Sequence, residues 1–123
     1  MRDTGFVIER DVLQAYTERR RRIVIPSQVR MVGAGAFRGK KGLRRVTIPK
    51  NVEIIGAEAF AGCKRLRKVV GGERLKSVGR QAFANCKRLR HVVFATHVWD
   101  LARDAFAGCK RVTVSQPDHP YGV

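Results

Sequence analysis

The chain has 123 residues, enough for one ordinary domain, with 26 Lys and Arg against 10 Asp and Glu. The formal net charge is +16 and the sequence pI is about 11.2. Because 44% of the residues are apolar, we exclude a disordered polycation and expect a core beneath a basic surface. No stretch approaches 18 apolar residues and the start lacks an apolar signal region, so we expect no membrane span and an intracellular, cytoplasmic protein.

The first 22 residues end in a run of four arginines, Arg19 to Arg22, directly before the first apolar segment. We interpret this run as a flexible basic arm that becomes ordered on nucleic acid, because blocks of like charge are typical of such arms. The expected organisation is an N-terminal part over residues 1–22, repeats over 23–114 and a tail over 115–123.

Residues 23–114 contain four copies of a 23-residue repeat, at 23–45, 46–68, 69–91 and 92–114. Seven apolar or small columns keep this period, so chance is excluded as its origin. A unit this short cannot bury its own apolar face, and the copies are therefore predicted to stack into a solenoid with one continuous core. The repeated phenylalanines are Phe37, Phe60, Phe83 and Phe106, and the repeated cysteines are Cys63, Cys86 and Cys109.

Each copy is predicted to contain a main strand, a second short extended segment and a turn. Leu43, Val46 and Ile48 follow the Leu-x-x-Leu-x-Leu spacing of a repeat strand, and Pro49 ends it because proline cannot donate to a sheet ladder. Residues 52–55 form the second extended segment. The Ala-Phe pair is predicted to lie on a short helical or 3₁₀ turn, so the fold class is a mainly β repeat solenoid with such turns, its parallel strands about 4.8 Å apart.

The segment from Ile48 to Leu66 reads Ile-Pro-x-x-Val-x-x-Ile-Gly-x-x-Ala-Phe-x-x-Cys-x-x-Leu. This pattern resembles the BspA-like, or Treponema pallidum-type, leucine-rich repeat (LRR). The resemblance covers about residues 23–114 and implies a non-enzymatic binding scaffold, often a surface adhesin or an interaction protein. It also implies an N-terminal capping hairpin, with strands at Phe6–Glu9 and Val12–Tyr16 joined by a turn at Arg10-Asp11.

The positive charge is concentrated on the first three copies. Residues 23–91 hold 17 basic and 3 acidic side chains, for a net charge of +14, whereas residues 1–22 carry +2, the fourth copy +1 and the tail −1. The cations follow the cysteine position and the buried leucine, as in Lys-Arg-Leu-Arg-Lys after Cys63 and Lys-Arg-Leu-Arg-His after Cys86. In a stacked solenoid these cations form a ridge suited to a polyanion that releases its counterions on binding.

Trp99 falls in a column that alternation predicts to be exposed. Beside a basic surface it can stack on a base or act as a protein hot spot, and alternatively it folds over the C-terminal end of the solenoid. The residues predicted to bind nucleic acid or an acidic partner are Arg19, Arg20, Arg21, Arg22, Lys41, Arg44, Arg45, Lys64, Arg65, Arg67, Lys68, Lys87, Arg88, Arg90, Lys110, Arg111 and Trp99.

Catalytic and metal sites find little support in the sequence. The three cysteines are expected to be buried and inert, and Cys63 and Cys109 lie two turns apart, too far to share one tetrahedral zinc ion. An odd number of cysteines does not favour a disulfide framework. The sequence contains neither a His-Glu-x-x-His motif nor a glycine-rich phosphate loop. We therefore expect no enzyme, no cofactor and no metal.

Two functions from different classes remain. The leading hypothesis is a non-catalytic module whose basic ridge binds a polyanion, RNA rather than DNA. The alternative is a protein-interaction scaffold that docks an acidic partner or self-associates through the open edge of its last turn. A basic face without a ligand, and adhesion to heparin-like or anionic membrane surfaces, are weaker alternatives.

Overall fold

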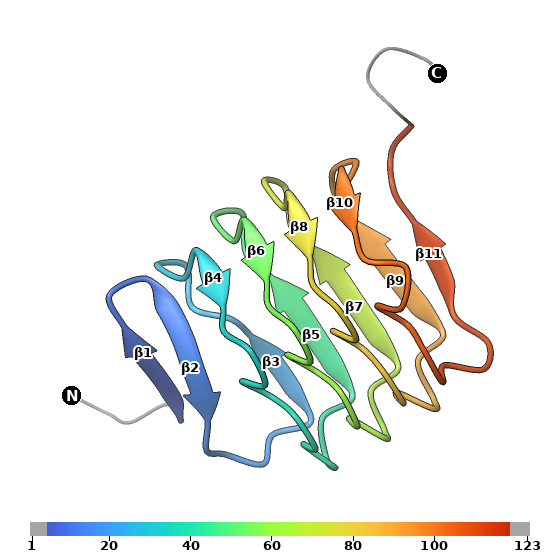
Figure 1. Cartoon of the computed structure of the whole chain (residues 1–123). Helices are drawn as coiled ribbons and strands as arrows, with labels where there is room; N and C mark the ends of the chain where they lie inside the picture. Colours follow the sequence, from blue (N-terminus) through green and yellow to red (C-terminus); the bar gives the residue numbers. More distant parts are fainter. Residues whose placement is uncertain (1–4, 119–123) are drawn as a thin grey trace.

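The structure is a computed structural model, described here for residues 5–118 (Figure 1). The chain forms a β-solenoid of about five turns, which follow one another from the N-terminal to the C-terminal end. Eleven strands form two sheets, and residues 5–118 contain no helix, hence none that could cross a membrane. The predicted repeat solenoid is confirmed.

The N-terminal end is a hairpin of β1 (Phe6–Glu9) and β2 (Val12–Tyr16), as the family resemblance implies. Its strands are antiparallel, and Arg10 takes a positive φ of 60° in the tight turn between them. β2 then pairs in parallel with the first short strand of the solenoid. The hairpin therefore continues one sheet and covers the first turn of the core.

Parallel strands build the rest of both sheets. The five-stranded sheet contains β3 (Arg22–Val24), β5 (Arg45–Ile48), β7 (Lys68–Gly71), β9 (His91–Phe94) and β11 (Thr113–Ser115). The six-stranded sheet adds β4 (Met31–Val32), β6 (Ile54–Ile55), β8 (Ser77–Val78) and β10 (Asp100–Leu101) to the hairpin.

The register of the five-stranded sheet pairs equivalent positions of successive copies. Val46 lies opposite Val69, and Val69 opposite Val92, so the 23-residue period becomes a straight column across the strands. The last step differs, because Val92 pairs with Val114, 22 residues further on. The final turn is thus one residue shorter than the repeat.

The expectation of a short helical or 3₁₀ segment around the Ala-Phe pair is wrong. In the second copy this region is a series of turns over residues 57–62. Its amides alternate between local and inter-turn partners: the Ala59 N–H donates to Gly56 O (3.2 Å), whereas the Phe60 N–H donates to Ala82 O of the next copy (2.7 Å). Since every second amide bonds to the neighbouring turn, no continuous helical ladder can form.

A stack of phenylalanines runs through the core. Phe60 is fully buried and lies 4.8 Å from the Phe37 ring and 5.1 Å from the Phe83 ring, centroid to centroid, with the planes within 4° of parallel. Such offset aromatic pairs stabilise beyond the area that they bury. The stack ends at Phe106, which is only half-buried and has one aromatic neighbour, Phe83, among the described residues.

Candidate functional site

The outer face of the five-stranded sheet carries the first column of cations. Strand alternation points Ile23 and Val46 inward and Arg22 and Arg45 outward. The sheet register places each outward side chain beside its equivalent on the next strand. The cations of this column are Arg22, Arg45 and Lys68, and His91 occupies the fourth position.

A second column precedes each of these strands and is held by the backbone. The Arg44 N–H donates to Arg21 O (2.6 Å), the Arg67 N–H to Arg44 O (2.8 Å) and the Arg90 N–H to Arg67 O (3.0 Å). These four arginines are exposed, and each lies one turn from the next. Their backbone positions are therefore fixed even though their side chains face solvent.

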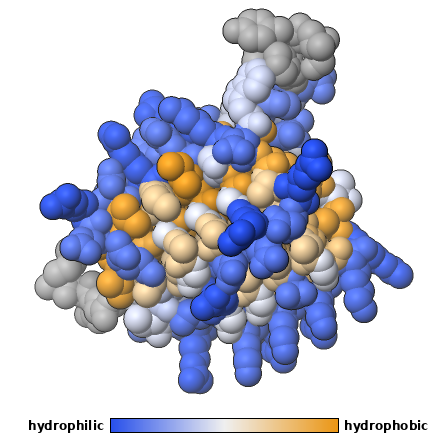
Figure 2. Space-filling view, in the orientation of Figure 1, coloured by the Kyte–Doolittle hydropathy of each residue, from blue (hydrophilic) through white to orange (hydrophobic). Residues whose placement is uncertain are grey.

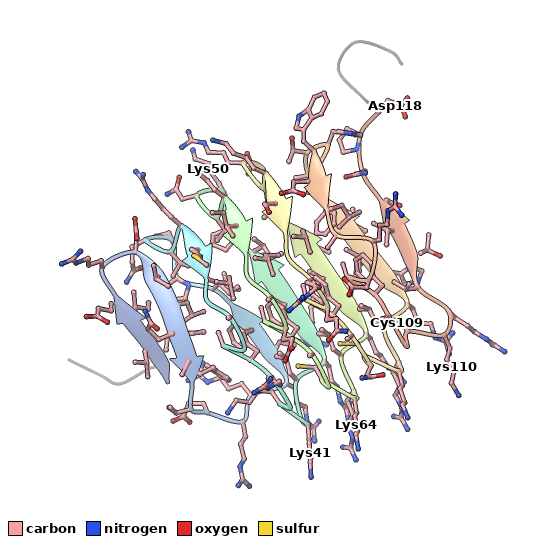
Figure 3. All side chains as sticks on the ribbon, viewed as in Figure 1. Lys41, Lys50, Lys64, Cys109, Lys110 and Asp118 are labelled. Atoms are coloured by element: carbon pink, nitrogen blue, oxygen red, sulfur yellow. The ribbon has the colours of Figure 1, made fainter. Side chains whose placement is uncertain are left out.

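Two further columns project from the turns that follow the cysteine position. Figure 3 shows Lys41, Lys64 and Lys110 extending from the same edge of the solenoid, and Figure 2 shows hydrophilic side chains projecting along that edge. We call all these cations the basic ridge. It comprises Arg21, Arg22, Lys41, Arg44, Arg45, Lys64, Arg65, Arg67, Lys68, Lys87, Arg88, Arg90, Lys110 and Arg111.

The basic ridge is a region of crowded like charge. The pKa of Arg44 is lowered, first by the charge of Arg21 and then by partial desolvation and by other ridge arginines, Arg65, Arg67 and Arg88. Acidic side chains pair elsewhere: the ion pairs among residues 5–118 are Arg30–Asp11 (3.9 Å), Lys76–Glu53 (3.6 Å) and Arg38–Glu58. None of these three cations belongs to the ridge.

Two hollows on the ridge surface are lined mainly by its cations. One, of about 460 Å³, is lined by Arg67, Arg88 and Arg90. The other, of about 330 Å³, is lined by Lys41, Gly42, Lys64 and Arg65. Cations thus line both of these hollows.

The interpretation of residues 19–22 as a flexible arm is wrong for its second half. Arg22 is the first residue of β3, and the Arg21 carbonyl accepts hydrogen bonds from the amides of Arg44 (2.6 Å) and Arg45 (3.0 Å). Arg19 lines a hollow together with Lys40 and other residues of the first turn. Pairing with the next copy therefore holds the end of this run against the solenoid.

Trp99 is exposed, as alternation predicts, but it lies apart from the ridge. The residue is 59% exposed, and its ring meets that of His97 edge-on, with 5.1 Å between the ring centres. The hollow beside it is lined by Glu53, Arg74, Leu75, Lys76, Thr96 and His97, none of which is a ridge residue. A role of Trp99 in binding remains a prediction.

One feature of this face was missed in the sequence. Beside the cation column, the outer face of the five-stranded sheet carries a second column of β-branched residues, in which Val24 is 65% and Val93 41% exposed. Thr47 and Val70 complete this column. The signal was available, because the same alternation that points Arg45 outward also points Thr47 outward, two residues later.

The cysteine column is structural in its inner positions. The Cys63 and Cys86 thiols are fully buried and donate to Phe37 O and Phe60 O, both at 3.1 Å. Cys109 repeats this contact with Phe83 O (3.0 Å) but is half-buried. Within residues 5–118, no three His, Cys, Asp or Glu side chains are grouped so as to hold a metal ion.

Comparison with known proteins finds a family profile that matches most of the chain. A family profile described as "BspA type Leucine rich repeat region (6 copies)" matches residues 11–120. Among curated proteins, no match is found.

Several solved structures of bacterial LRR proteins are similar to the chain. One from Eubacterium ventriosum is 28% identical, with a TM-score of 0.79 over 87% of this chain and 30% of its own. One from Bacteroides capillosus is 25% identical, with a TM-score of 0.73 over 85% and 86%. The LRR protein of T. pallidum is 28% identical, with a TM-score of 0.59 over 89% and 66%. The chain thus spans under a third of the length of the E. ventriosum protein.

Proposed function

Because the chain belongs to the BspA-type leucine-rich repeat family, we propose that it is a non-catalytic binding module whose basic ridge docks an acidic partner protein. The observation that carries this proposal is the in-register stacking of cations such as Arg22, Arg45 and Lys68. None of the ion pairs among residues 5–118 involves a cation of the ridge. A surface evolved for solubility alone intersperses charges of both signs.

An acidic partner relieves a cost that the free chain bears. Like charges held one strand spacing apart repel each other, and opposite charges on a partner remove that repulsion while steering its approach. The exposed β-branched column that contains Val24 and Val93 lies beside the cations and supplies apolar contact area. A protein partner uses both kinds of surface.

RNA is the second candidate, and the regularity of the ridge favours it. The sequence Lys-Arg-Leu-Arg recurs after Cys63 and after Cys86, so similar cations return with every turn. A uniform polymer of phosphates fits such a repeating pattern without any readout of bases.

A pull-down with a charge-reversal variant separates the two candidates. We would reverse four ridge cations to glutamate, Lys64, Arg65, Lys87 and Arg88. The matched control reverses four exposed cations outside the ridge, Lys50, Arg74, Arg80 and Arg103. We expect the ridge variant to lose its partner, the control to keep it, and nuclease treatment to leave the complex intact.

Each other outcome is decisive. Loss of the complex on nuclease treatment would replace the acidic protein by RNA, and a steep fall of RNA affinity with salt would support that replacement. Equal loss in both variants would show a dependence on total charge, which would overturn the assignment of the site to the ridge.

A further inference from the structure

Three arginines from two neighbouring turns line a single hollow of about 460 Å³ in the basic ridge: Arg67, Arg88 and Arg90. We propose that this hollow binds a phosphoryl group carried by a phosphorylated side chain of the partner protein. The proposal rests on the function proposed above and names the chemical group that its site recognises.

The side-chain chemistry distinguishes this hollow from the rest of the ridge. A guanidinium is planar, stays charged at every physiological pH and presents its N–H donors as a rigid fork that matches the oxygens of phosphate. A phosphoryl group offers three oxygens and close to two negative charges, whereas a carboxylate offers two oxygens and one charge. Lysine acts only as a point charge, and the hollow that contains Lys41 and Lys64 is lined by one arginine, Arg65, instead of three.

The backbone holds these arginines in place. The Arg90 N–H donates to Arg67 O (3.0 Å), which ties the two arginines across neighbouring turns. Leu66 and Leu89, which precede them, are fully buried, and the Leu89 N–H donates to Cys86 O (3.1 Å) across the turn that carries Arg88. Only the side chains have to become ordered when an anion binds.

The hollow also lies where the repeat supplies a complete set of arginines. A complete set combines the arginine before one strand with both arginines of the following turn. It occurs twice, as Arg44 with Arg65 and Arg67 and, one turn later, as Arg67 with Arg88 and Arg90, and the second set lines the hollow. The first copy has Gly42 in place of the arginine that follows the post-cysteine lysine, and the last has Thr113 in place of the arginine after the core position. The nearby Arg44, whose pKa is lowered by Arg67 and Arg88 among others, shows that positive charge accumulates here.

The test compares peptides that differ in one side chain, using the full chain at about 0.15 M salt. The probes are acidic peptides with a central phosphoserine or, in its place, a glutamate, and affinity is measured by titration calorimetry. We expect the phosphoserine peptide to bind at least about tenfold more tightly than the glutamate peptide. Inorganic phosphate and a short single-stranded RNA of matched charge serve as competitors.

The decisive variant keeps the charge and removes the forks: Arg67→Lys, Arg88→Lys and Arg90→Lys together. It should bind both peptides alike, at about the affinity of the wild type for the glutamate peptide. The control changes Arg38, Arg80 and Arg103 to lysine and should retain the preference. All six positions are exposed, so both variants are expected to fold, and Arg88→Lys alone provides a milder test.

The outcomes separate this proposal from the broader one. Equal binding of the two peptides by the wild type would overturn the phosphoryl site and leave docking of acidic proteins standing. If acidic proteins failed to bind while the preference for phosphoserine persisted, the phosphoryl site would stand and the docking of acidic proteins would be overturned. Tighter binding of the RNA, lost in the lysine variant, would assign the hollow to nucleic acid and overturn the proposal. If inorganic phosphate bound as tightly as the phosphoserine peptide, the hollow would be a site for free phosphate, and its assignment to a phosphorylated partner protein would be overturned.

Discussion

If the basic ridge is shaped for a partner, removing one of its cations should stabilise the free chain. Arg45 is the best position for this test, because the sheet register places it between Arg22 on β3 and Lys68 on β7. The change Arg45→Gln keeps a polar, though shorter, side chain and removes two unfavourable neighbour interactions. The matched control is Arg38→Gln, which removes the exposed ion pair with Glu58.

The expected magnitude follows from the strand spacing. Two unit charges about 4.8 Å apart in water repel by about 0.9 kcal/mol, and screening at about 0.1 M salt reduces this to about 0.5 kcal/mol. Two neighbours therefore limit the gain to about 1 kcal/mol, and splaying of the long side chains lowers it. The control should lose up to about 0.5 kcal/mol, the usual contribution of an exposed ion pair.

Urea unfolding followed by circular dichroism measures both variants at low and at high salt. We expect Arg45→Gln to raise the free energy of unfolding at low salt and the difference to shrink at about 1 M salt, where the Debye length is about 3 Å. An unchanged or lowered stability of Arg45→Gln at low salt would refute the view that the stacked cations repel each other. An increase of the same size at high salt would show that its origin is not electrostatic.

Three further predictions concern the phenylalanine stack, a glycine of β7 and the cysteine of the last turn. Phe60→Ala should lower the free energy of unfolding by about 3–5 kcal/mol, and Phe106→Ala by less, because Phe106 is half-buried and stacks on one ring. Gly71→Ala should cost about 2 kcal/mol or more, since φ is 110° and a Cβ would lie 2.2 Å from the carbonyl oxygen of Ile48 on β5; urea unfolding measures all three. Alkylation should occur first at Cys109, because it is half-buried whereas Cys63 and Cys86 are fully buried. It should accelerate as pH rises through about 7, since the neighbouring Cys86 lowers the pKa of Cys109 to about 7, and mass spectrometry of the labelled protein locates the site. A larger loss for Phe106→Ala than for Phe60→Ala, a neutral Gly71→Ala, or equal labelling of all three cysteines in the folded chain would each contradict the corresponding expectation.

Much of the fold could be predicted because the period of the sequence is also the period of the structure. Once Phe37 and Phe60 are 23 residues apart with the same neighbours, stacking is the arrangement that buries both, and the register of the strands follows. The outward direction of Arg45 follows from alternation on the same strand. These inferences depend on many positions that agree with one another.

The features that were missed depend on single positions or on partners that spacing does not specify. The Ala-Phe segment looks helical because its local turns use the same short-range bonds, and only the competing bond from the Phe60 amide to the next copy excludes a helix. The shorter last turn depends on one missing residue before Val114, which conservative replacements in the fourth copy conceal. The separation of Trp99 from the ridge depends on which sheet the strand that follows it joins, and that strand, β10, joins the six-stranded sheet, which carries no ridge.

Because equivalent residues pair directly, as Arg45 does with Lys68, the length of the ridge is set by the number of repeat copies. Insertion of one further copy between two turns would lengthen the ridge by about 4.8 Å and leave the stacking of its neighbours unchanged. Each such copy would also bring its own Lys-Arg-x-Arg set, so the reach of the surface and the number of its cations would grow together. Gene duplication could therefore adjust the length of partner that the ridge spans in discrete steps, with no need to redesign the core.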